Sequence, residues 1–338
     1  VEIGAGEELP GATLQILDGD GNVVEIKDND GNVIETCEWV SGTEPKYIEG
    51  LKTGVEYTLR ETIAPDGYTI TSDTKFTIDE KGVITSSGTT SKDENGVTIL
   101  VVEDDLTHIT VSKVDTGAGE ELPGAKIQII DEDGNVVEEW TSTTEPHQID
   151  GLKTGVKYIL REKVAPLGYT LTSDTTFTID EYGKVTSTGT VNQEGMLVIE
   201  DTITVVDILK VDAKTDKGLA GAKLQVLDDN GTVCEEWTST AEPHRIAGLY
   251  TGVTYTLHEV SAPKGYKVAK DVTFKIDEYG KVSGDTVKDG VVIMKDEQNP
   301  PPKNKTGDDA NATLWALLMA LAGSVLGGTV WFRRRRRV

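Results

Sequence analysis

The sequence has few of the residues on which disulfide, zinc and redox chemistry depend. Among 338 residues there are two cysteines, Cys37 and Cys234, which cannot form a disulfide framework. There is no CxxC motif, and the four histidines stand singly, so a structural zinc site is not expected. No GxSxG motif, Cys–His pair or metal-ligand spacing indicates an enzyme. We expect no cofactor and no metal, and we expect both cysteines to be small buried or half-buried residues.

Positive charge is also scarce. Lys and Arg number 33 against 58 Asp and Glu, which gives a formal net charge of −25. Five of the cations form one run at 333–337, so the rest of the chain is still more acidic. A body of this charge repels phosphate backbones, which excludes nucleic acid as a partner. No aromatic cluster or basic patch marks a ligand site, although exposed loops could bind a host molecule.

One long apolar run lies near the end of the chain. Residues 314–332 are 19 uncharged, mostly apolar residues, about the length that crosses a hydrocarbon core of roughly 30 Å. The arginine run follows at once, and positive flanks stay on the cytoplasmic side. We expect a transmembrane helix at 314–332, a basic cytoplasmic tail at 333–338 and an acidic body outside the cell. The alternative is a buried core helix followed by a basic tail.

The body contains three internal repeats. The segments GLKTGVEYTLRETIAPDGYTI, GLKTGVKYILREKVAPLGYTL and GLYTGVTYTLHEVSAPKGYKV place equivalent tyrosines at Tyr68, Tyr169 and Tyr266. We expect three modules, which we call modules one, two and three, followed by a Pro-rich spacer. Their expected bounds are 1–105, 106–202, 203–298 and, for the spacer, 299–313.

The modules alternate apolar and polar residues over short runs separated by Gly and Asn turn signals. This pattern predicts an all-β protein of three tandem antiparallel β-sandwiches of immunoglobulin-like type, stacked as a rod. Trp39, Trp140 and Trp237 recur at equivalent positions, which favours a packing role. Module one carries an Asp-rich insertion at 18–35. It could bind calcium, but it lacks a bidentate Glu and the full ligand spacing, so plain turns are the preferred interpretation.

Three acidic residues occupy positions in the strand alternation where apolar residues are expected. Alternate residues of a strand share a face, and Glu162 shares its face with Tyr158 and Leu160. Glu61 and Glu259 have the same phase in modules one and three. Each module therefore directs one glutamate towards its core.

Aspartate and lysine repeat this pattern on the last and first strands. Asp104, Asp201 and Asp296 lie in the apolar phase of the last strand of each module, and Lys113 and Lys210 in that of the first strand of modules two and three. The lysine and glutamate are 49 residues apart in both modules. Buried charges cost several kcal/mol each unless they are paired or neutralised. Each Lys–Glu–Asp trio is therefore either a noncovalent buried network or a group that reacts.

The segments YTLRETIAPDGY, YILREKVAPLGY and YTLHEVSAPKGY fit the pattern YxLxExxAPxGY, called the E-box. THITVSKVD, LVVED and LVIED complete the likeness. The body thus resembles SpaA-like pilin and collagen-adhesin B-type (Cna B-type) domains of Gram-positive surface proteins, which have a prealbumin-like fold. The resemblance implies an isopeptide bond between a first-strand lysine and a last-strand Asn or Asp, assisted by the E-box glutamate.

Carried over, Lys113 joins Asp201 with Glu162 assisting, and Lys210 joins Asp296 with Glu259 assisting. The chemistry is reasonable, because burial favours a neutral amine and a protonated acid, and a neutral amine is a nucleophile. Such a bond forms once, so it is self-modification and not turnover.

Module one departs from this pattern. The residue equivalent to Lys113 would precede Val1, so Glu61 and Asp104 have no amine partner. We expect no crosslink there in this chain, and we expect a longer parent protein to supply the lysine.

The segment before the apolar run resembles a cell-wall sorting signal. Residues 303–307, KNKTG, match the Thr and Gly of the LPXTG motif but not its Leu and Pro. The resemblance implies that a sortase cuts between Thr306 and Gly307 and joins Thr306 to peptidoglycan. The predicted function is a wall- or membrane-anchored stalk of an adhesin or accessory pilin. The alternative is an adhesin whose modules themselves bind a host or matrix ligand.

Overall fold

The computed structural model describes residues 1–301, and all regular structure in this part of the chain is β-strand. The expected span at 314–332, the motif residues Thr306 and Gly307 and the tail at 333–338 lie outside the described residues. Within residues 1–301 no helix is long and apolar enough to cross a membrane. The all-β prediction is confirmed.

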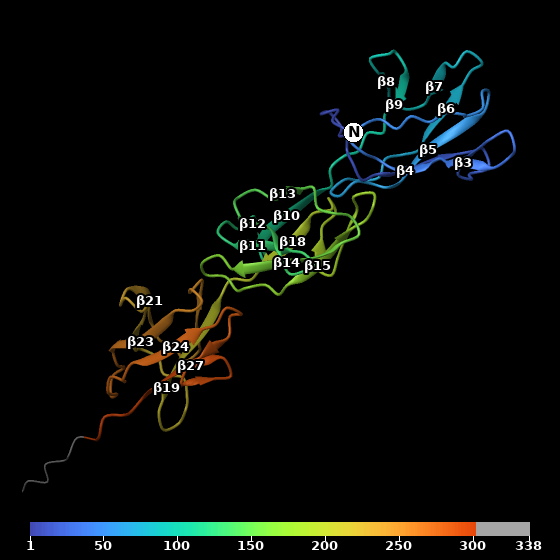
Figure 1. Cartoon of the computed structure of the whole chain (residues 1–338). Helices are drawn as coiled ribbons and strands as arrows, with labels where there is room; N and C mark the ends of the chain where they lie inside the picture. The colour runs from blue at the N-terminus through green and yellow to red at the C-terminus, as the bar shows by residue number, and fades with distance from the viewer. Residues whose placement is uncertain (302–338) are drawn as a thin grey trace, which may run out of the picture.

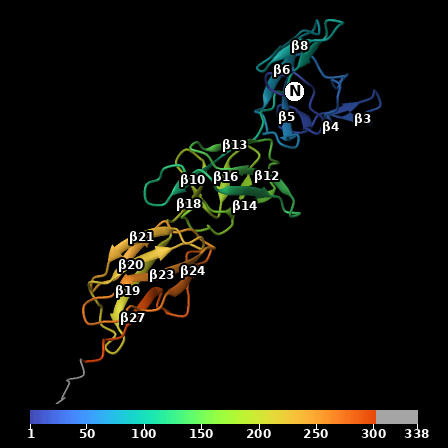
Figure 2. The ribbon, with the colours of Figure 1, turned by 90° about the vertical axis from the view of Figure 1, so that its left-hand side faces the viewer.

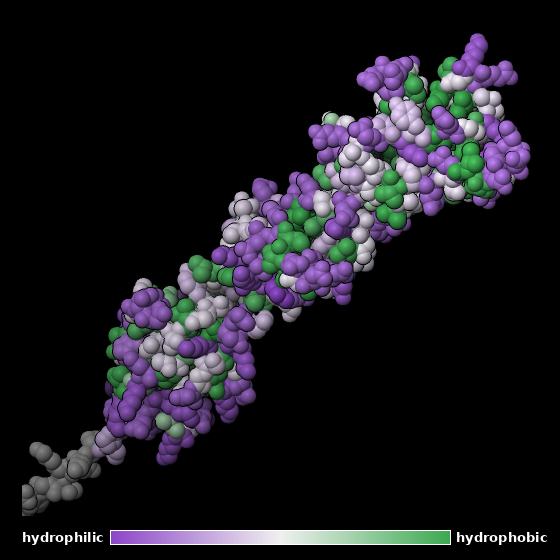
Figure 3. Space-filling model, in the orientation of Figure 1, coloured by the Kyte–Doolittle hydropathy of each residue, from purple (hydrophilic) through white to green (hydrophobic). Residues whose placement is uncertain are grey.

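The three modules follow one another along a rod (Figure 1). A second view, turned by 90°, shows the same elongated arrangement, with each module occupying its own stretch of the axis (Figure 2). The face shown in Figure 3 is mostly hydrophilic, with small separate apolar patches. The prediction of three stacked modules is therefore confirmed at the level of the fold.

Module two is a sandwich of two sheets. One has the strand order β12-β11-β14-β15-β16 and the other β13-β10-β18-β17. The strand bounds are β10 (His108–Asp115), β11 (Lys126–Ile130), β12 (Val136–Thr141), β13 (His147–Asp150), β14 (Lys157–Val164), β15 (Thr175–Ile179), β16 (Val185–Ser187), β17 (Thr190–Val191) and β18 (Leu197–Asp201).

Module three repeats this arrangement with the orders β21-β20-β23-β24-β25 and β22-β19-β27-β26. Its strand bounds are β19 (Val205–Asp212), β20 (Lys223–Leu227), β21 (Val233–Thr238), β22 (His244–Ala247), β23 (Thr254–Ser261), β24 (Val272–Ile276), β25 (Val282–Ser283), β26 (Val287–Lys288) and β27 (Val291–Asp296).

One strand pair in each of these modules departs from the antiparallel pattern. The first and last strands, β10 with β18 and β19 with β27, pair in parallel. Both members of a pair run in the same direction along the rod, because the chain enters each module at one end and leaves it at the other. In module two the register places Lys113 beside Ile199 and Asp115 beside Asp201.

Module one keeps one complete sheet, of order β4-β1-β5-β6-β7, and two small hairpins. The insertion forms the hairpin β2–β3, and the last strand β9 pairs with β8. The strand bounds are β1 (Thr13–Leu17), β2 (Glu25–Lys27), β3 (Val33–Thr36), β4 (Glu38–Val40), β5 (Glu56–Ile63), β6 (Thr74–Ile78), β7 (Ile84–Ser86), β8 (Thr90–Lys92) and β9 (Thr98–Leu100).

A single parallel bridge stands where module two has its parallel strand pair. It joins Glu2 to Asp104, as Asp115 is joined to Asp201 in module two. By this register the position equivalent to Lys113 comes immediately before Val1. The structure thus agrees with the sequence alignment of the two modules.

Each module has its own hydrophobic core. The three clusters of buried apolar side chains do not share residues, and each is confined to one module. In module two Tyr158 and Phe177 pack at the centre with ring centroids 5.4 Å apart. Trp140 packs against this core and stacks on His147 at 4.4 Å, in line with the predicted packing role of the tryptophans. Because each core is self-contained, residues 1–301 form three folded units by their own contacts.

The Asp-rich segments form turns. Asp18 accepts hydrogen bonds from the backbone N–H groups of Asp20 and Asn22, and Asp28 does the same for Asp30 and Asn32. In residues 1–301 no three His, Cys, Asp or Glu side chains group as a metal site would require. The carboxylates of Asp18 and Asp28 thus stabilise turns, as the preferred interpretation held.

The two cysteines differ in environment. Cys37 is buried in the core of module one, as expected, whereas Cys234 is exposed. The expectation for Cys234 was wrong, because it lies on the outward face of the edge strand β21.

The junction between modules is held by backbone hydrogen bonds around one threonine. The N–H of Thr107 donates to the carbonyl of Gly67, and the carbonyl of Thr107 accepts from the N–H of Gly151. The Thr107 hydroxyl donates to the carbonyl of Leu152 at 2.6 Å. Thr204 makes the same set of contacts between modules two and three, with the partners Gly168, Gly248 and Leu249.

The junctions also need two glycines in close contact. Gly168 has φ +83°, and a Cβ there would lie 2.9 Å from the carbonyl oxygen of Gly248. The first junction repeats this approach between Gly67 and Gly151, at 2.7 Å. A side chain at either position would force the modules apart, so the rod depends on these glycines.

Candidate crosslink site

Three charged side chains meet inside module three. They come from three strands: Lys210 from β19, Glu259 from β23 and Asp296 from β27. All three side chains are fully buried. The Lys210 Nζ lies 3.0 Å from Glu259 Oε1 and donates a hydrogen bond to Asp296 Oδ1. One amine and two carboxyl groups thus share a site that water does not reach.

The same constellation occurs in module two. The Lys113 Nζ lies 3.4 Å from Glu162 Oε1 and 2.5 Å from Asp201 Oδ1. Lys113 is 2% exposed and Asp201 0% exposed. The short contact between Lys113 and Asp201 does not have hydrogen-bond geometry, because Nζ has no hydrogen-bond partner in the described part of the chain. The amine of Lys113 is therefore in direct contact with the carboxyl group of Asp201 without a hydrogen bond between them.

The E-box strand and the loop after it hold the glutamate in place. Glu162 pairs with Ile127 at a register shift between β11 and β14, and its side chain points inward. Its Oε2 accepts a hydrogen bond from the N–H of Thr172 at 2.9 Å. Glu259 Oε2 accepts from the N–H of Ala269 in the same way, at 2.5 Å. One carboxyl oxygen is anchored by the loop, and the other is left to face the lysine.

The aspartate of module two has a second neighbour that sequence analysis missed. The hydroxyl of Thr172 donates to Asp201 Oδ1 at 2.8 Å, while the N–H of the same residue holds Glu162. Thr172 thereby sets the positions of both acids. Module three has Ala269 at this place, so only the N–H contact is common to the two sites.

Several buried oxygens at the two sites have no hydrogen-bond partner within residues 1–301. They are Glu162 Oε1, Asp201 Oδ2, Glu259 Oε1 and Asp296 Oδ2. Unpaired buried polar atoms are uncommon in folded proteins, because each one costs free energy. Glu61 Oε1 and Asp104 Oδ1 of module one also lack a partner, so this feature marks the inward-facing acids of all three modules.

Burial shifts one acid of each trio, Glu162 and Asp296, towards its neutral form. It raises the pKa of Glu162 to about 7, although the N–H of Thr172 and the amine of Lys113 act in the opposite direction. Burial also raises the pKa of Asp296, against the hydrogen bond and charge of Lys210. Near neutral pH a substantial fraction of Glu162 is therefore protonated and able to donate a hydrogen bond.

Module one has the two acids without a lysine. Glu61 and Asp104 are both buried, and within residues 1–301 neither forms an ion pair with a lysine. Burial is the main cause that raises the pKa of Glu61 to about 7 and that of Asp104 to about 6. Glu61 Oε2 accepts from the N–H of Thr71, which is the counterpart of the Thr172 contact. Module one therefore offers an acid pair with the same loop anchor but without a lysine.

The E-box tyrosine of module three joins the end of the first strand to the segment by which the chain leaves the module, which sequence analysis also missed. The Tyr266 hydroxyl donates to Asp212 Oδ2 at 2.8 Å, and Gln298 donates to the same oxygen at 3.0 Å. The Tyr266 hydrogen bond is the largest cause that lowers the pKa of Asp212. The available signal was the KVD sequence, which places an aspartate two residues after each core lysine.

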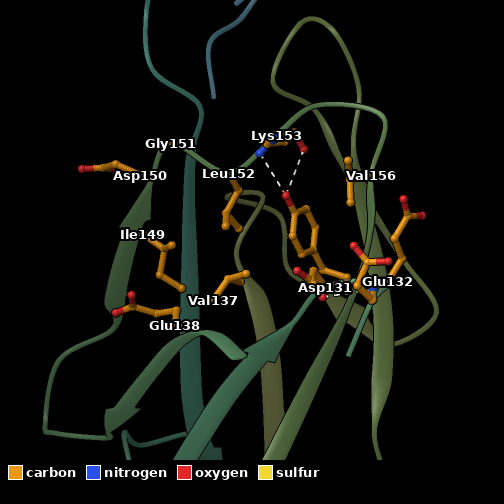
Figure 4. A pocket seen from close by; sticks show the side chains of 12 residues that line it. Asp131, Glu132, Val137, Glu138, Ile149, Asp150, Gly151, Leu152, Lys153 and Val156 are labelled. Carbon is orange, nitrogen blue, oxygen red and sulfur yellow. Dashed lines mark hydrogen bonds between the residues drawn. The ribbon is translucent and has the colours of Figure 1, made fainter. Parts of the chain in front are cut away.

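A separate hollow of about 400 Å³ lies at the other end of module two (Figure 4). It is lined by Tyr158 together with Leu152, Val137, Ile149 and Val156. The Tyr158 hydroxyl accepts a hydrogen bond from the N–H of Lys153 and contacts its carbonyl. None of the trio residues lines this hollow, so it is not part of the candidate site.

Comparison with known proteins agrees with this geometry. Residues 1–92, 107–194 and 204–289 each match the SpaA prealbumin-like fold domain, and together they make up most of the chain. The chain belongs to the SpaA prealbumin-like fold domain family. Each matched segment contains the E-box glutamate of its module, whereas the last-strand aspartates Asp104, Asp201 and Asp296 follow the matched residues. Membership is consistent with a structural, pilus-related protein of the cell surface.

Solved structures include similar chains at low identity. The TIE protein of Bacillus anthracis is 19% identical with a TM-score of 0.41, over 87% of this chain and 49% of its own. The pilus adhesin SpaC of Lactobacillus rhamnosus GG is 15% identical with a TM-score of 0.35, over 88% and 42%. The shaft pilin SpaA of the same organism is 14% identical with a TM-score of 0.25, over 57% and 98%. The chain thus spans about half the length of the TIE protein, and no curated protein sequence matches it.

Proposed function

We propose that this chain is the tension-bearing stalk of an anchored surface protein, either an adhesin or an accessory pilin. In this proposal modules two and three staple themselves with isopeptide bonds, Lys113 to Asp201 and Lys210 to Asp296. The observation that carries it is the burial of a lysine, a glutamate and an aspartate in mutual contact, repeated at equivalent positions of two modules.

The reaction balances without any added reagent. The neutral Nζ of Lys113 forms a bond to Cγ of the protonated Asp201, and the bond from Cγ to its hydroxyl oxygen breaks. Protonated Glu162 polarises the Asp201 carbonyl by hydrogen bonding, then passes the amine proton to the departing hydroxyl. One amide and one water are formed, and Glu162 ends as it began. Fixed side chains replace a bimolecular encounter, which lowers the barrier. In module three Glu259 has the same role towards Lys210 and Asp296.

The parallel strand pair explains why such a bond suits a stalk. β10 enters module two at one end, and β18 leaves it at the other. Force applied along the rod would enter at Thr107, follow β10 to Lys113, cross the bond to Asp201 and leave at Thr204. The 87 residues from 114 to 200 would then carry none of the load. The hydrogen-bonded junctions at Thr107 and Thr204 would pass the force from one module to the next.

The proposed location is the cell surface of an exporting cell, with the modules outside. Support comes from the SpaA family membership and from the sequence near the chain end. The apolar run at 314–332 would hold the protein in the membrane, with the arginines in the cytoplasm. A sortase that accepts KNKTG would transfer Thr306 to peptidoglycan and release Gly307 with the span.

Intact-mass measurement of residues 1–301 tests the central proposal. We expect a mass lower than that of the sequence by two waters, one for each trio. Proteolysis should yield one branched peptide pair containing Lys113 and Asp201, and another containing Lys210 and Asp296. A mass equal to that of the plain sequence would mean that both trios are noncovalent ion networks. The acid pair of module one is the internal control, since it should appear in no branched peptide.

A further inference from the structure

Module three differs from the other two modules in charge at one end. At six equivalent positions it has lysine where modules one and two have glycine, glutamate, aspartate, leucine, threonine or serine. The six residues are Lys214, Lys217, Lys264, Lys267, Lys270 and Lys295. In a chain of net charge −25, six lysines gained at matched positions of one module are a local gain of positive charge.

The six lysines come from three segments that the fold brings together. The hydrogen bond from Tyr266 to Asp212 places the E-box turn beside the loop that holds Lys214 and Lys217. Lys295 on β27 pairs with Asp216 of that loop at 2.6 Å. Lys267, Lys270 and Lys295 also line one open groove of about 870 Å³, together with Lys288 and the four carboxylates Asp216, Asp271, Asp285 and Glu297. The cluster is therefore a continuous surface, which we call the lysine end.

The lysine end is exposed and only partly neutralised. All six side chains are exposed, and two of them are paired, Lys267 with Glu297 and Lys295 with Asp216. In the described part of the chain no carboxylate pairs with the other four, which are Lys214, Lys217, Lys264 and Lys270. These lysines do not form a basic run in the sequence, because they are spread over segments up to 81 residues apart.

The lysine end also exposes apolar surface. Val268 is 57% exposed and lies between Lys267 and Lys270. Its equivalents meet the next module: the N–H of Ile70 donates to the backbone carbonyl of Glu181, and the N–H of Leu171 donates to that of Glu278. Among residues 1–301 module three has no following module, so Val268 is left at the tip. Lysines around an exposed aliphatic side chain are typical of surfaces that meet a lipid interface.

The position of the lysine end in the rod indicates what it faces. The chain leaves module three there, at the end of the rod farthest from module one, and this end is strongly hydrophilic (Figures 1 and 3). The apolar run begins at Leu314, 13 residues after Pro301. Even a fully extended chain of that length reaches no more than about 45 Å.

We propose that the lysine end docks module three on the anionic phospholipid headgroups of the membrane in which the chain is anchored. The proposal rests on the proposed membrane anchoring through residues 314–332. Lysines near an anionic bilayer are attracted to it, and the attraction fades within about 10 Å at 0.1 M salt. Contact at this end would hold the base of the rod against the membrane, while the acidic modules one and two are repelled from it.

Vesicle binding tests the proposal. Residues 1–301, which lack the apolar run, are incubated with phosphatidylcholine vesicles, with or without phosphatidylglycerol, and the bound fraction is measured by sedimentation. We expect binding only to the anionic vesicles and its loss at high salt. The variant K214E/K217E/K264E should bind at least on the order of 100-fold more weakly, since loss of each lysine costs roughly a factor of five near such a surface and each glutamate adds repulsion.

A matched variant controls for net charge. K126E/K157E/K184E reverses three exposed lysines of module two, and it should keep the binding of the parent. Equal weakening by the two triple variants, equal binding to uncharged vesicles, or no binding by the parent would overturn the proposal. Equally tight binding of a soluble phosphodiester polymer at the same lysines would overturn the choice of a bilayer as partner. The mass of each sample reports the isopeptide bonds, so failure of the two proposals can be told apart.

Discussion

Replacing Glu162 by Gln should prevent the crosslink while keeping the packing and the loop hydrogen bond of the side chain. Gln keeps the shape of the side chain and can still accept the N–H of Thr172, but it cannot take up and release a proton. We expect the Lys113–Asp201 bond not to form in Glu162→Gln, while the bond of module three still does. The intact mass should then rise by one water, apart from the small difference between the two side chains.

The expected loss of stability follows from the loop that the bond closes. Lys113 and Asp201 are 88 residues apart, and closing a loop of that length restricts the unfolded chain by about 4–5 kcal/mol. For a domain of about 100 residues, 1 kcal/mol corresponds to a Tm shift of roughly 4–8 °C. The thermal transition of module two should therefore fall by roughly 20–35 °C.

Differential scanning calorimetry of residues 1–301 measures this fall in Tm if module two unfolds as a separate transition. Glu61→Gln is the matched control, because Glu61 is also buried and also holds a loop N–H, but has no lysine beside it. Its transition should stay in place or rise. If Glu162→Gln lowers Tm no more than Glu61→Gln does, or if the mass deficit of two waters survives in Glu162→Gln, the assigned role is refuted.

Three further results are expected. Gly168→Ala should bend or loosen the junction between modules two and three and shorten the maximum dimension in small-angle X-ray scattering. Gly265→Ala, at similar φ but with open space around it, should not, and equal profiles would contradict the role given to the glycine contact. The raised pKa values of Glu61 and Asp104 mean that their contribution to stability is complete below about pH 4 and is lost as the pH rises to about 7. Urea unfolding of module one should show this decline, and Glu61→Gln should flatten it. Thr204→Val removes two hydroxyl hydrogen bonds and should destabilise the second junction by about 1–3 kcal/mol, measured as faster amide exchange there.

The candidate trios could be predicted because their signal is local. On a strand every second side chain has the same direction, so the phase of Glu162 among Tyr158 and Leu160 already indicated burial. Repetition in a second module then identified which charged residues belong together. The structure brings Lys210, Glu259 and Asp296 within contact, as that phase implied.

Other features depend on contacts that no short segment encodes. The parallel pairing of β10 with β18 follows from the route of the whole chain through the sandwich, and the alternation of apolar residues is the same for either strand direction. The junction contacts of Thr107 and Gly67 join two modules across 40 residues. Cysteine is a residue type usually found in cores, but Cys234 faces outward on an edge strand. Its orientation is decided by the register in which β21 pairs with β20.

The parallel pairing of the first and last strands has a consequence for how far the molecule can be stretched. An unstapled module that gave way under load would release the 87 residues between 114 and 200, adding on the order of 300 Å to the reach of the chain. With Lys113 joined to Asp201 beside the exit, that slack is enclosed in a ring and never lengthens the tether. Whatever is carried at the far tip would then keep nearly the same distance from its anchor in still fluid and under shear.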